Sequence, residues 1–296
     1  MTRSSWIKAL SGIGAIGAGG AMFAYSRSAS AKAPNSDKES GTAPAKKNTP
    51  SQTTPLEWEG LLPLPTAKDV KGSVDANWGA TPKDLRALFL LGEEASKIEG
   101  AGRILATIAK RESAFVVTAH NGDEVDEQAE RDATRRAYEA RKDKNPPLAF
   151  GEAAADFGSG GLFGHSAPYF LWTGVAELGA KAPLLASDPR IMFVPRVATF
   201  AALVYLQRIL AGYRVDDHGD IKAGWASPSL LVDGRGGETY QAVRERFYAD
   251  AKELGVDLAD TKTIPAKLSA AAWPGVQAVF DRVVGTLPTP KNKGKV

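Results

Sequence analysis

Cysteine is absent from this chain of 296 residues, and histidine is nearly so. Without cysteine there are no disulfide bonds, no thiol nucleophile and no metal site built on thiolates. The absence also suits an oxidising compartment, where stray thiols are a liability. The three histidines, His120, His165 and His218, lie far apart in the sequence and form no His-Glu-x-x-His or comparable pattern. We therefore expect no metal and no other cofactor.

The chain also has little excess charge of either sign. Its formal net charge is +3, which is too small to predict binding to nucleic acid. Basic residues gather near the two ends of the chain, so the middle is closer to neutral; those of the tail are Lys291, Lys293 and Lys295. We interpret these basic ends as solvated segments, with attraction to an anionic surface as the alternative.

Residues 1–31 are typical of an export signal. Arg3 and Lys8 flank the start of an apolar, Gly/Ala-rich run that ends near Tyr25, and Ala29-Ser30-Ala31 offers a cleavage site. The run is at the low end of the roughly 17 to 25 residues that a membrane span requires, so residues 6–25 could instead be retained as a membrane tether. Both alternatives predict an exported protein of the periplasm or cell envelope, one of them anchored in the inner membrane.

The composition divides the rest of the chain into three parts. Residues 32–55 are rich in Ser, Ala, Pro, Lys and Thr and lack large apolar side chains, so they cannot bury enough surface to offset the entropy of ordering. We predict that this segment is a disordered linker. Apolar residues resume at Leu56, which predicts a folded domain over 56–288, followed by a basic tail at 289–296.

Helix signals dominate the domain. Thr81-Pro82 opens one apolar-periodic segment, and the run from Pro195 to Leu210 is apolar nearly all round, which indicates a central buried helix. Acids and bases alternate from Glu124 to Asp143, which predicts a solvated helix inserted into the domain. Further helices are expected at 100–115, 166–178, 236–254, 265–272 and 274–284, with candidate strands at 115–118 and 230–232. The predicted fold class is mainly α.

Glu112 lies near the end of the predicted helix at 100–115. The apolar positions of this helix recur at helical spacing, and they are Ile104, Leu105, Ile108 and Ala109. The same spacing places Glu112 on their face, where burial favours the protonated form that a general acid needs. An acid is also disfavoured near a helix C-terminus by the dipole, so chance placement is a weak explanation. The alternative is a solvated carboxylate at a helix end.

Three short motifs follow one another along the chain. They are Arg111-Glu112-Ser113-x-Phe115, Gly160-Gly161-Leu162-Phe163-Gly164 and Lys222-Ala223-Gly224-Trp225-Ala226-Ser227-Pro228. In this order the segment from about Leu85 to Pro228 resembles the lytic transglycosylases of the lysozyme-like superfamily. In that family a helix ends in a catalytic Glu-Ser followed by an aromatic residue, a Gly-Leu-Met-Gln-like turn lines the sugar cleft, and a Tyr-Asn-Ala-Gly-like segment lies downstream. The resemblance implies a helical domain similar to goose-type lysozyme or soluble lytic transglycosylase.

The resemblance also implies roles for individual residues. Glu112 would be the single general acid and base, and Ser113 would fix it or contact the substrate. Gly161 and Leu162 match the glycine and leucine of the cleft turn. The aromatic residues of the set offer faces on which a pyranose ring can stack, although core packing is the alternative for Trp225. The implied substrate-binding residues are Ser113, Phe115, Gly161, Leu162, Phe163, Tyr169 and Trp225.

Some features depart from the family pattern. Gly164 stands at the glutamine position and Ala226 at the asparagine position, so two polar side chains that the family usually keeps are missing. Glu112 and Gly161 lie about 49 positions apart, farther than in compact members. The charged segment 124–144 supplies the excess, either as a flap or partner-binding helix or as an inert surface excursion. A hydrolase would need a second carboxylate, for which the candidates are Asp123, Glu152 and Asp156.

The function implied by the resemblance is cleavage of the β-1,4 bond between N-acetylmuramic acid and N-acetylglucosamine in peptidoglycan glycan strands. The product is left open between a 1,6-anhydro end and a hydrolysed end. One alternative is a metal-dependent peptidoglycan hydrolase using the histidines with Asp123, Asp217 or Asp220, although no metal pattern supports it. The other is an exported, non-catalytic peptidoglycan-binding or structural module with a degenerate lysozyme-like fold.

Overall fold

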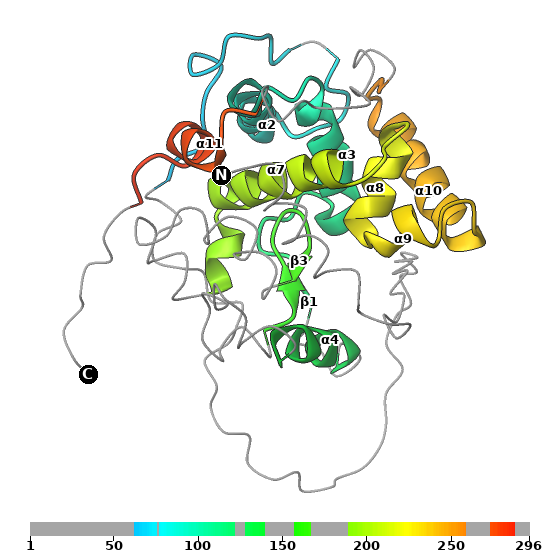
Figure 1. Cartoon of the computed structure of the whole chain (residues 1–296). Coiled ribbons are helices and arrows are strands. Elements are labelled where there is room, and N and C mark those ends of the chain that lie inside the picture. The colour runs from blue at the N-terminus through cyan, green and yellow to red at the C-terminus, as the bar shows by residue number, and fades with distance from the viewer. Residues whose placement is uncertain are drawn as a thin grey trace, which may run out of the picture. The chain divides into compact units, whose positions relative to one another are not determined.

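A computed structural model describes residues 62–75, 77–121, 128–139, 157–166, 189–258 and 273–287. The predicted export signal, linker and basic tail lie outside these residues, as do the helix expected at 265–272 and all but Ser166 of the helix expected at 166–178. The described part is mainly helical, as predicted (Figure 1). Its helices are α2 (Lys83–Ser96), α3 (Ala101–Ser113), α4 (Gln128–Glu139), α7 (Pro195–Gly212), α8 (His218–Ala226), α9 (Ser229–Val232), α10 (Glu238–Leu254) and α11 (Val276–Val283), with a 3₁₀ helix η5 at Pro189–Phe193.

Helix α7 lies at the centre of the core, as the continuous apolar run predicted. Pro195 stands at its first turn, where the missing N–H costs nothing, and from Val197 to Val204 every side chain is buried. Helices α2, α8 and α11 pack on α7, and Figure 1 shows it running between them. A helix buried on all sides gives the surrounding elements a fixed support.

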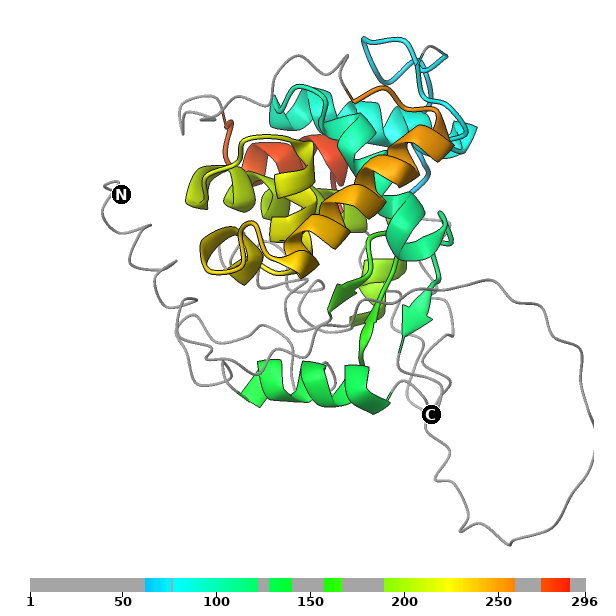
Figure 2. The ribbon, with the colours of Figure 1, turned by 90° about the vertical axis from the view of Figure 1, so that its right-hand side faces the viewer.

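Helix α3 has the amphipathic pattern that the sequence predicted. Ile104, Leu105, Ile108 and Ala109 are all at most 1% exposed. Helices α2 and α10 pack against α3, and Figure 2 shows α10 crossing beside it. The helix ends with Ala114 and Phe115, two consecutive residues in the left-handed region, at φ +49° and +66°. Such a conformation costs an L-residue about 1–2 kcal/mol, so the chain turns sharply directly after Glu112 and Ser113.

The strands differ from those expected. A small antiparallel sheet in the order β1-β2-β3 is formed by His120–Asn121, Ser159–Gly160 and His165–Ser166. The prediction of strands at 115–118 and 230–232 was wrong. Residues 115–118 form turns after the left-handed end of α3, and 230–232 belong to α9, because Pro228 already has helical angles. Short apolar runs do not distinguish a strand from a buried helical turn.

One helix begins slightly later than Thr81-Pro82 predicted. Helix α2 starts at Lys83, Pro82 occupies the cap position with an extended ψ of 133°, and no side chain caps the helix. The buried Thr81 hydroxyl finds no hydrogen-bond partner among the described residues. Helix α4 confirms a charged helix within 124–143, over Gln128–Glu139, with an Arg135–Glu139 ion pair at i, i+4. It packs against β2.

Candidate active site around Glu112

Glu112 lies in the last turn of α3, and its side chain is 25% exposed. Helical spacing places it beside the buried face, as predicted, but its neighbour is not apolar. The ammonium of Lys222, on α8, donates a hydrogen bond to Oε1 of Glu112. Helical periodicity predicted apolar neighbours for this carboxyl group. The expected apolar environment was therefore wrong, because a residue 110 positions away supplies the opposite charge.

Ser113 connects the end of α3 to the glycine-rich turn. Its hydroxyl lies 3.0 Å from the carbonyl oxygen of Ala109 and 2.9 Å from that of Leu162. The residue is only 8% exposed, so this hydroxyl is used inside the protein. Sequence reasoning left two roles for Ser113, fixing Glu112 or contacting substrate. In the structure the hydroxyl joins the end of α3 to the glycine-rich turn, and both predicted roles stay predictions.

The turn from Gly161 to Gly164 needs glycine at both ends. Gly161 has φ +72°, and a Cβ there would lie 2.4 Å from the carbonyl oxygen of Met192. Gly164 has φ +60°, and a Cβ there would lie 3.1 Å from Oε2 and 3.2 Å from Cβ of Glu112. Glu112 therefore fills the space that a side chain at 164 would need. This close approach gives a physical reason for the absence of the glutamine that the family pattern led us to expect.

Leu162 and Phe163, predicted to bind substrate, are both completely buried. The Phe163 ring packs near those of Phe89, at 6.0 Å between centroids, and Trp225, at 6.2 Å. Since neither side chain has exposed surface, neither can stack on a ligand in this conformation. Both residues belong to the core, so the apolar residues of this motif serve packing.

Trp225 lies on α8, a helix that the sequence did not predict. Its ring is 9% exposed and packs near Tyr205, at 5.1 Å between centroids, and His165, at 5.4 Å. Burial lowers the pKa of His165 to about 3, while a backbone hydrogen bond at Ala198 acts in the opposite direction. The imidazole is therefore neutral at physiological pH and forms part of an aromatic cluster.

The remaining predicted site residues divide into two groups. Phe115 is half-buried and packs against the core from its left-handed turn. Its role in substrate binding stays a prediction. The others lie outside the described residues, and these are Tyr169 and the candidate second carboxylates Asp123, Glu152 and Asp156.

The histidines are arranged differently from what their sequence separation suggested. His120 on β1 and His165 on β3 both pair in register with Gly160 of β2. The Nε2 atom of His120 lies 2.6 Å from the carbonyl oxygen of Phe157. Within the described ranges, no group of three or more His, Cys, Asp or Glu residues could hold a metal ion. Asp217 and Asp220, which we considered as metal ligands, instead face arginines.

Asp220 forms the centre of a buried polar network that fixes α8. Tyr240 and Arg244 of α10 both donate to its Oδ1, and Arg235 donates to its Oδ2 at 3.0 Å. Burial alone would raise the pKa of Asp220, but the Tyr240 hydroxyl, the Asp216 N–H and the two arginines outweigh it and lower that pKa. Asp217 caps α8 by accepting from the Asp220 N–H at 3.1 Å. The network joins α8 firmly to α10.

Sequence reasoning missed Lys222 as a site residue, although the lysine was part of a quoted motif. The available signal was its position between Ile221 and Ala223, both of which are fully buried. A lysine inside an apolar helix is rarely buried unless it is paired. The partner could not be identified, because its distance along the chain carries no periodic signal.

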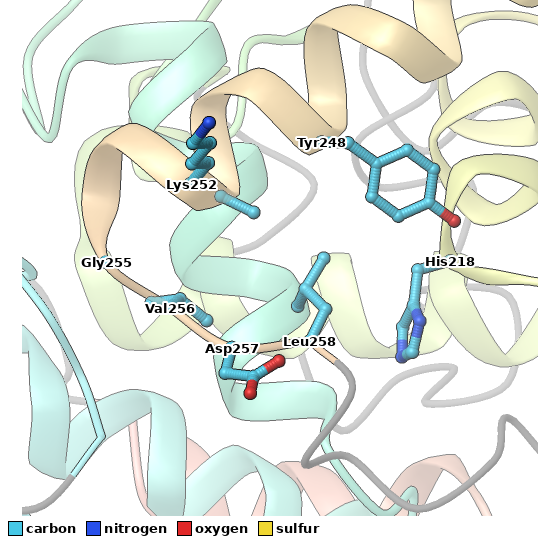
Figure 3. Close-up of a pocket in the computed structure, with 8 residues that line it drawn as sticks. His218, Tyr248, Lys252, Gly255, Val256, Asp257 and Leu258 are labelled. Atoms are coloured by element: carbon cyan, nitrogen blue, oxygen red, sulfur yellow. The ribbon is translucent and has the colours of Figure 1, made fainter.

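A groove of about 520 Å³ lies at another place on the molecule (Figure 3). It is lined by His218 of α8, residues from the C-terminal half of α10, and the segment that follows α10 as far as Leu258. Burial lowers the pKa of His218, with Asp217 opposing, and burial raises the pKa of Tyr248. Glu112 is not among the lining residues, so this groove is separate from the candidate active site.

No family model, curated protein or solved structure matches this chain. None of the helices in the described residues is both long and apolar enough to span a membrane.

Proposed function

We propose that this chain is an exported peptidoglycan glycosidase of the lytic transglycosylase type, with Glu112 as general acid and base. The observation that carries the proposal is that three motifs far apart in the sequence meet at one carboxylate. Ser113 binds the glycine-rich turn at Leu162, Gly164 lies against Oε2 of Glu112, and Lys222 binds Oε1. A carboxylate held on one side by Lys222 and on the other by the turn is suited to proton transfer, which depends on geometry first.

The proposed reaction needs only one protein carboxyl group. Protonated Glu112 donates its proton to the glycosidic oxygen while the bond to the muramyl anomeric carbon breaks. The N-acetyl oxygen of the same sugar attacks that carbon, as in other substrate-assisted glycosidases. The Glu112 carboxylate then accepts the proton of the C6 hydroxyl. The C6 oxygen bonds to the anomeric carbon, and the bond between that carbon and the N-acetyl oxygen breaks. The products are a 1,6-anhydro-muramyl end and a free hydroxyl on the leaving sugar.

The substrate in this proposal is the glycan strand of peptidoglycan, and no metal or other cofactor takes part. The amino-terminal segment, as an export signal or retained tether, would deliver the domain to the periplasm or cell envelope. The charged helix α4, attached through β2, would lie on the segment that separates Glu112 from the glycine-rich turn. We assign it no catalytic step.

A second candidate is a non-catalytic module that binds peptidoglycan through a degenerate lysozyme-like fold. Two observations favour it. Lys222 holds the charge of Glu112 as an ion pair, and Gly164 supplies no side chain where the family usually has glutamine. Both candidates predict binding to the cell wall, so turnover distinguishes them.

The test is to incubate the purified full chain with peptidoglycan sacculi and to measure soluble muropeptides. We expect release by the wild type and loss of release in Glu112→Gln, which keeps the size of the side chain but cannot transfer the proton. Glu99→Gln is the matched control, since Glu99 is exposed between α2 and α3. Mass spectrometry should find muramyl ends lighter by one water.

Three outcomes would contradict parts of this proposal. Unchanged release by Glu112→Gln would remove Glu112 as the acid. Reducing muramyl ends would make the chain a hydrolase with an additional carboxylate. Binding to sacculi without any release would support the non-catalytic module.

A further inference from the structure

Lys222 is the least exposed lysine side chain that an ion pair engages in the described part of the chain, at 9% exposure. It lies on α8 between fully buried Ile221 and Ala223. An ammonium in such a place needs a partner, because removing an unpaired charge from water costs a great deal of free energy. Its ammonium donates to Oε1 of Glu112. The pair therefore constrains both side chains.

The support of Lys222 comes from the opposite face of α8. Asp220 and Lys222 are two positions apart, so about 200° of helix rotation separates them. Asp220 is fixed by Tyr240, Arg235 and Arg244, and the completely buried carboxylate holds α8 against α10. The other face of α8 then presents Lys222 to the end of α3. One network thus positions the lysine that positions Glu112.

The second carboxylate oxygen is constrained as well. Oε2 of Glu112 would lie 3.1 Å from a Cβ at Gly164, so it rests against the backbone of the turn. Ser113, the next residue, is tied to the same turn through the Leu162 carbonyl oxygen at 2.9 Å. With Lys222 on Oε1, the carboxylate has one side fixed by charge and one side fixed by contact.

We propose that Lys222 is a positioning residue for Glu112, which holds the carboxylate in its reactive orientation through the hydrogen bond to Oε1. This inference depends on the proposed function for its kinetic consequence, while the ion pair itself can be tested without any activity. Lys222 contacts no substrate atom in this scheme, since it acts through Glu112.

The other charged groups near the end of α3 already have partners. Lys110 lies 2.8 Å from Glu253, and Arg111 lies 2.5 Å from Asp250, so the two bases in the last turn of α3 are paired with acids of α10. His165, on the strand after Gly164, remains neutral above pH 3 because its pKa is about 3. Among these groups Lys222 has the one hydrogen bond to the Glu112 carboxylate that we find in the described residues.

The kinetic test compares wild type with Lys222→Met, which keeps an unbranched side chain of similar length and removes its charge. Lys83→Met, at an exposed position, is the matched control. We expect the maximal kcat on sacculi to fall about 10- to 100-fold with little change in KM, because a misplaced reacting group costs rate more than binding. The ratio of kcat to KM effects therefore distinguishes positioning from substrate binding.

The direct test measures the NMR chemical shift of the Glu112 side-chain carboxyl carbon at one fixed pH, with Glu112→Gln providing the assignment. We expect this chemical shift to change in Lys222→Met and to stay at the wild-type value in Lys83→Met. Lys222→Arg, which keeps the charge, should return the chemical shift toward the wild-type value. Circular dichroism confirms that each variant is folded under the conditions of measurement.

The two proposals fail in different ways. An identical chemical shift of the Glu112 carbon in wild type and Lys222→Met would overturn the role of Lys222. A changed chemical shift together with no release from sacculi by wild type would overturn the glycosidase and leave the ion pair intact. A changed chemical shift with unchanged maximal kcat would also overturn the positioning role, since orientation would then not matter.

Discussion

At the scale of single residues, Gly164 is required by its backbone angle and by the close approach of Glu112, neither of which is visible in the sequence. Its φ of +60° and its contact with Glu112 both exclude a side chain. Gly236 offers a comparison within the same chain, because its φ is +84° but a Cβ there would meet nothing within 4 Å. The two glycines separate the cost of the backbone angle from the cost of the contact.

We predict that Gly164→Ala lowers the free energy of unfolding by about 1 kcal/mol more than Gly236→Ala does, because only the first adds a collision to the left-handed strain. Gly164→Ala should also reduce release from sacculi, since Cβ would displace the Glu112 carboxylate. Urea unfolding followed by circular dichroism measures the stability of both variants. Equal losses would mean that Glu112 moves aside freely, which would weaken the case for a fixed carboxylate.

Glu112 was predictable as a position beside the buried face of α3, because a helix repeats every 3.6 residues and the buried face continues to its last turn. Its neighbours were not predictable, since a periodic pattern describes only the helix that carries it. Lys222 enters from another helix. Leu162 and Phe163 matched a cleft motif by residue type, but their complete burial is decided by neighbours such as Phe89 and Trp225.

At the scale of elements, α8 is a short helix whose position depends on polar contacts. It has nine residues, too few to be stable alone, and Asp217 caps its start. Asp220 is completely buried and faces two partly exposed arginines and a tyrosine. Without Asp220 the Tyr240 hydroxyl loses its acceptor, while Arg235 and Arg244 keep Asp216 and Asp217 as partners.

We predict that Asp220→Asn destabilises the protein by about 1.5–3 kcal/mol, because the buried hydrogen bonds from Tyr240 and the two arginines lose their charged acceptor. Asp233→Asn, at an exposed position after α9, should change stability by about 0.5 kcal/mol or less. Chemical denaturation at pH 7 checks both values. A small effect of Asp220→Asn would show that α8 is held mainly by its apolar side.

The elements themselves were predictable to different degrees. The pattern of apolar residues specified α3, α7 and the helix at 238–254 well, because each buries a face over several turns. Helix α8 was not predicted, since Gly224 and Pro228 are loop-forming residues and the contacts that hold the helix come from Asp217 and Asp220. The two-residue strands have no periodicity of their own, and their pairing depends on the turns that bring them together.

At the scale of the whole molecule, stability should depend on pH through His165. Its pKa is lowered from 6.5 to about 3 in the folded protein, so the folded form stays neutral while the unfolded chain takes up a proton below pH 6.5. The stability present above pH 6.5 is therefore lost as the pH falls from 6.5 towards 3. The lowered pKa of His218 acts in the same direction.

We predict that the free energy of unfolding declines between pH 6.5 and 4 by up to about 1.4 kcal/mol per pH unit on account of His165. His165→Phe, which keeps an aromatic ring against Trp225, should flatten this decline. Below the ordinary pKa of an aspartate, the lowered pKa of Asp220 adds a further loss of stability as the pH falls through its folded value. Thermal melts across the pH range measure both effects, and an equally steep decline in His165→Phe would contradict the first.

The pairing of β1 with β2 has a consequence for how this protein can change length. His120 and Gly160 are paired neighbours in the sheet, so the two ends of the segment 121–159 are held side by side. Insertions or deletions within this segment leave its two ends in place, and Glu112 and the glycine-rich turn keep their mutual geometry. A wide gap between two motifs in the sequence is therefore compatible with direct contact in space. Natural variation in length should concentrate in the segment 121–159, while the spacing between Glu112 and His120 should remain constant.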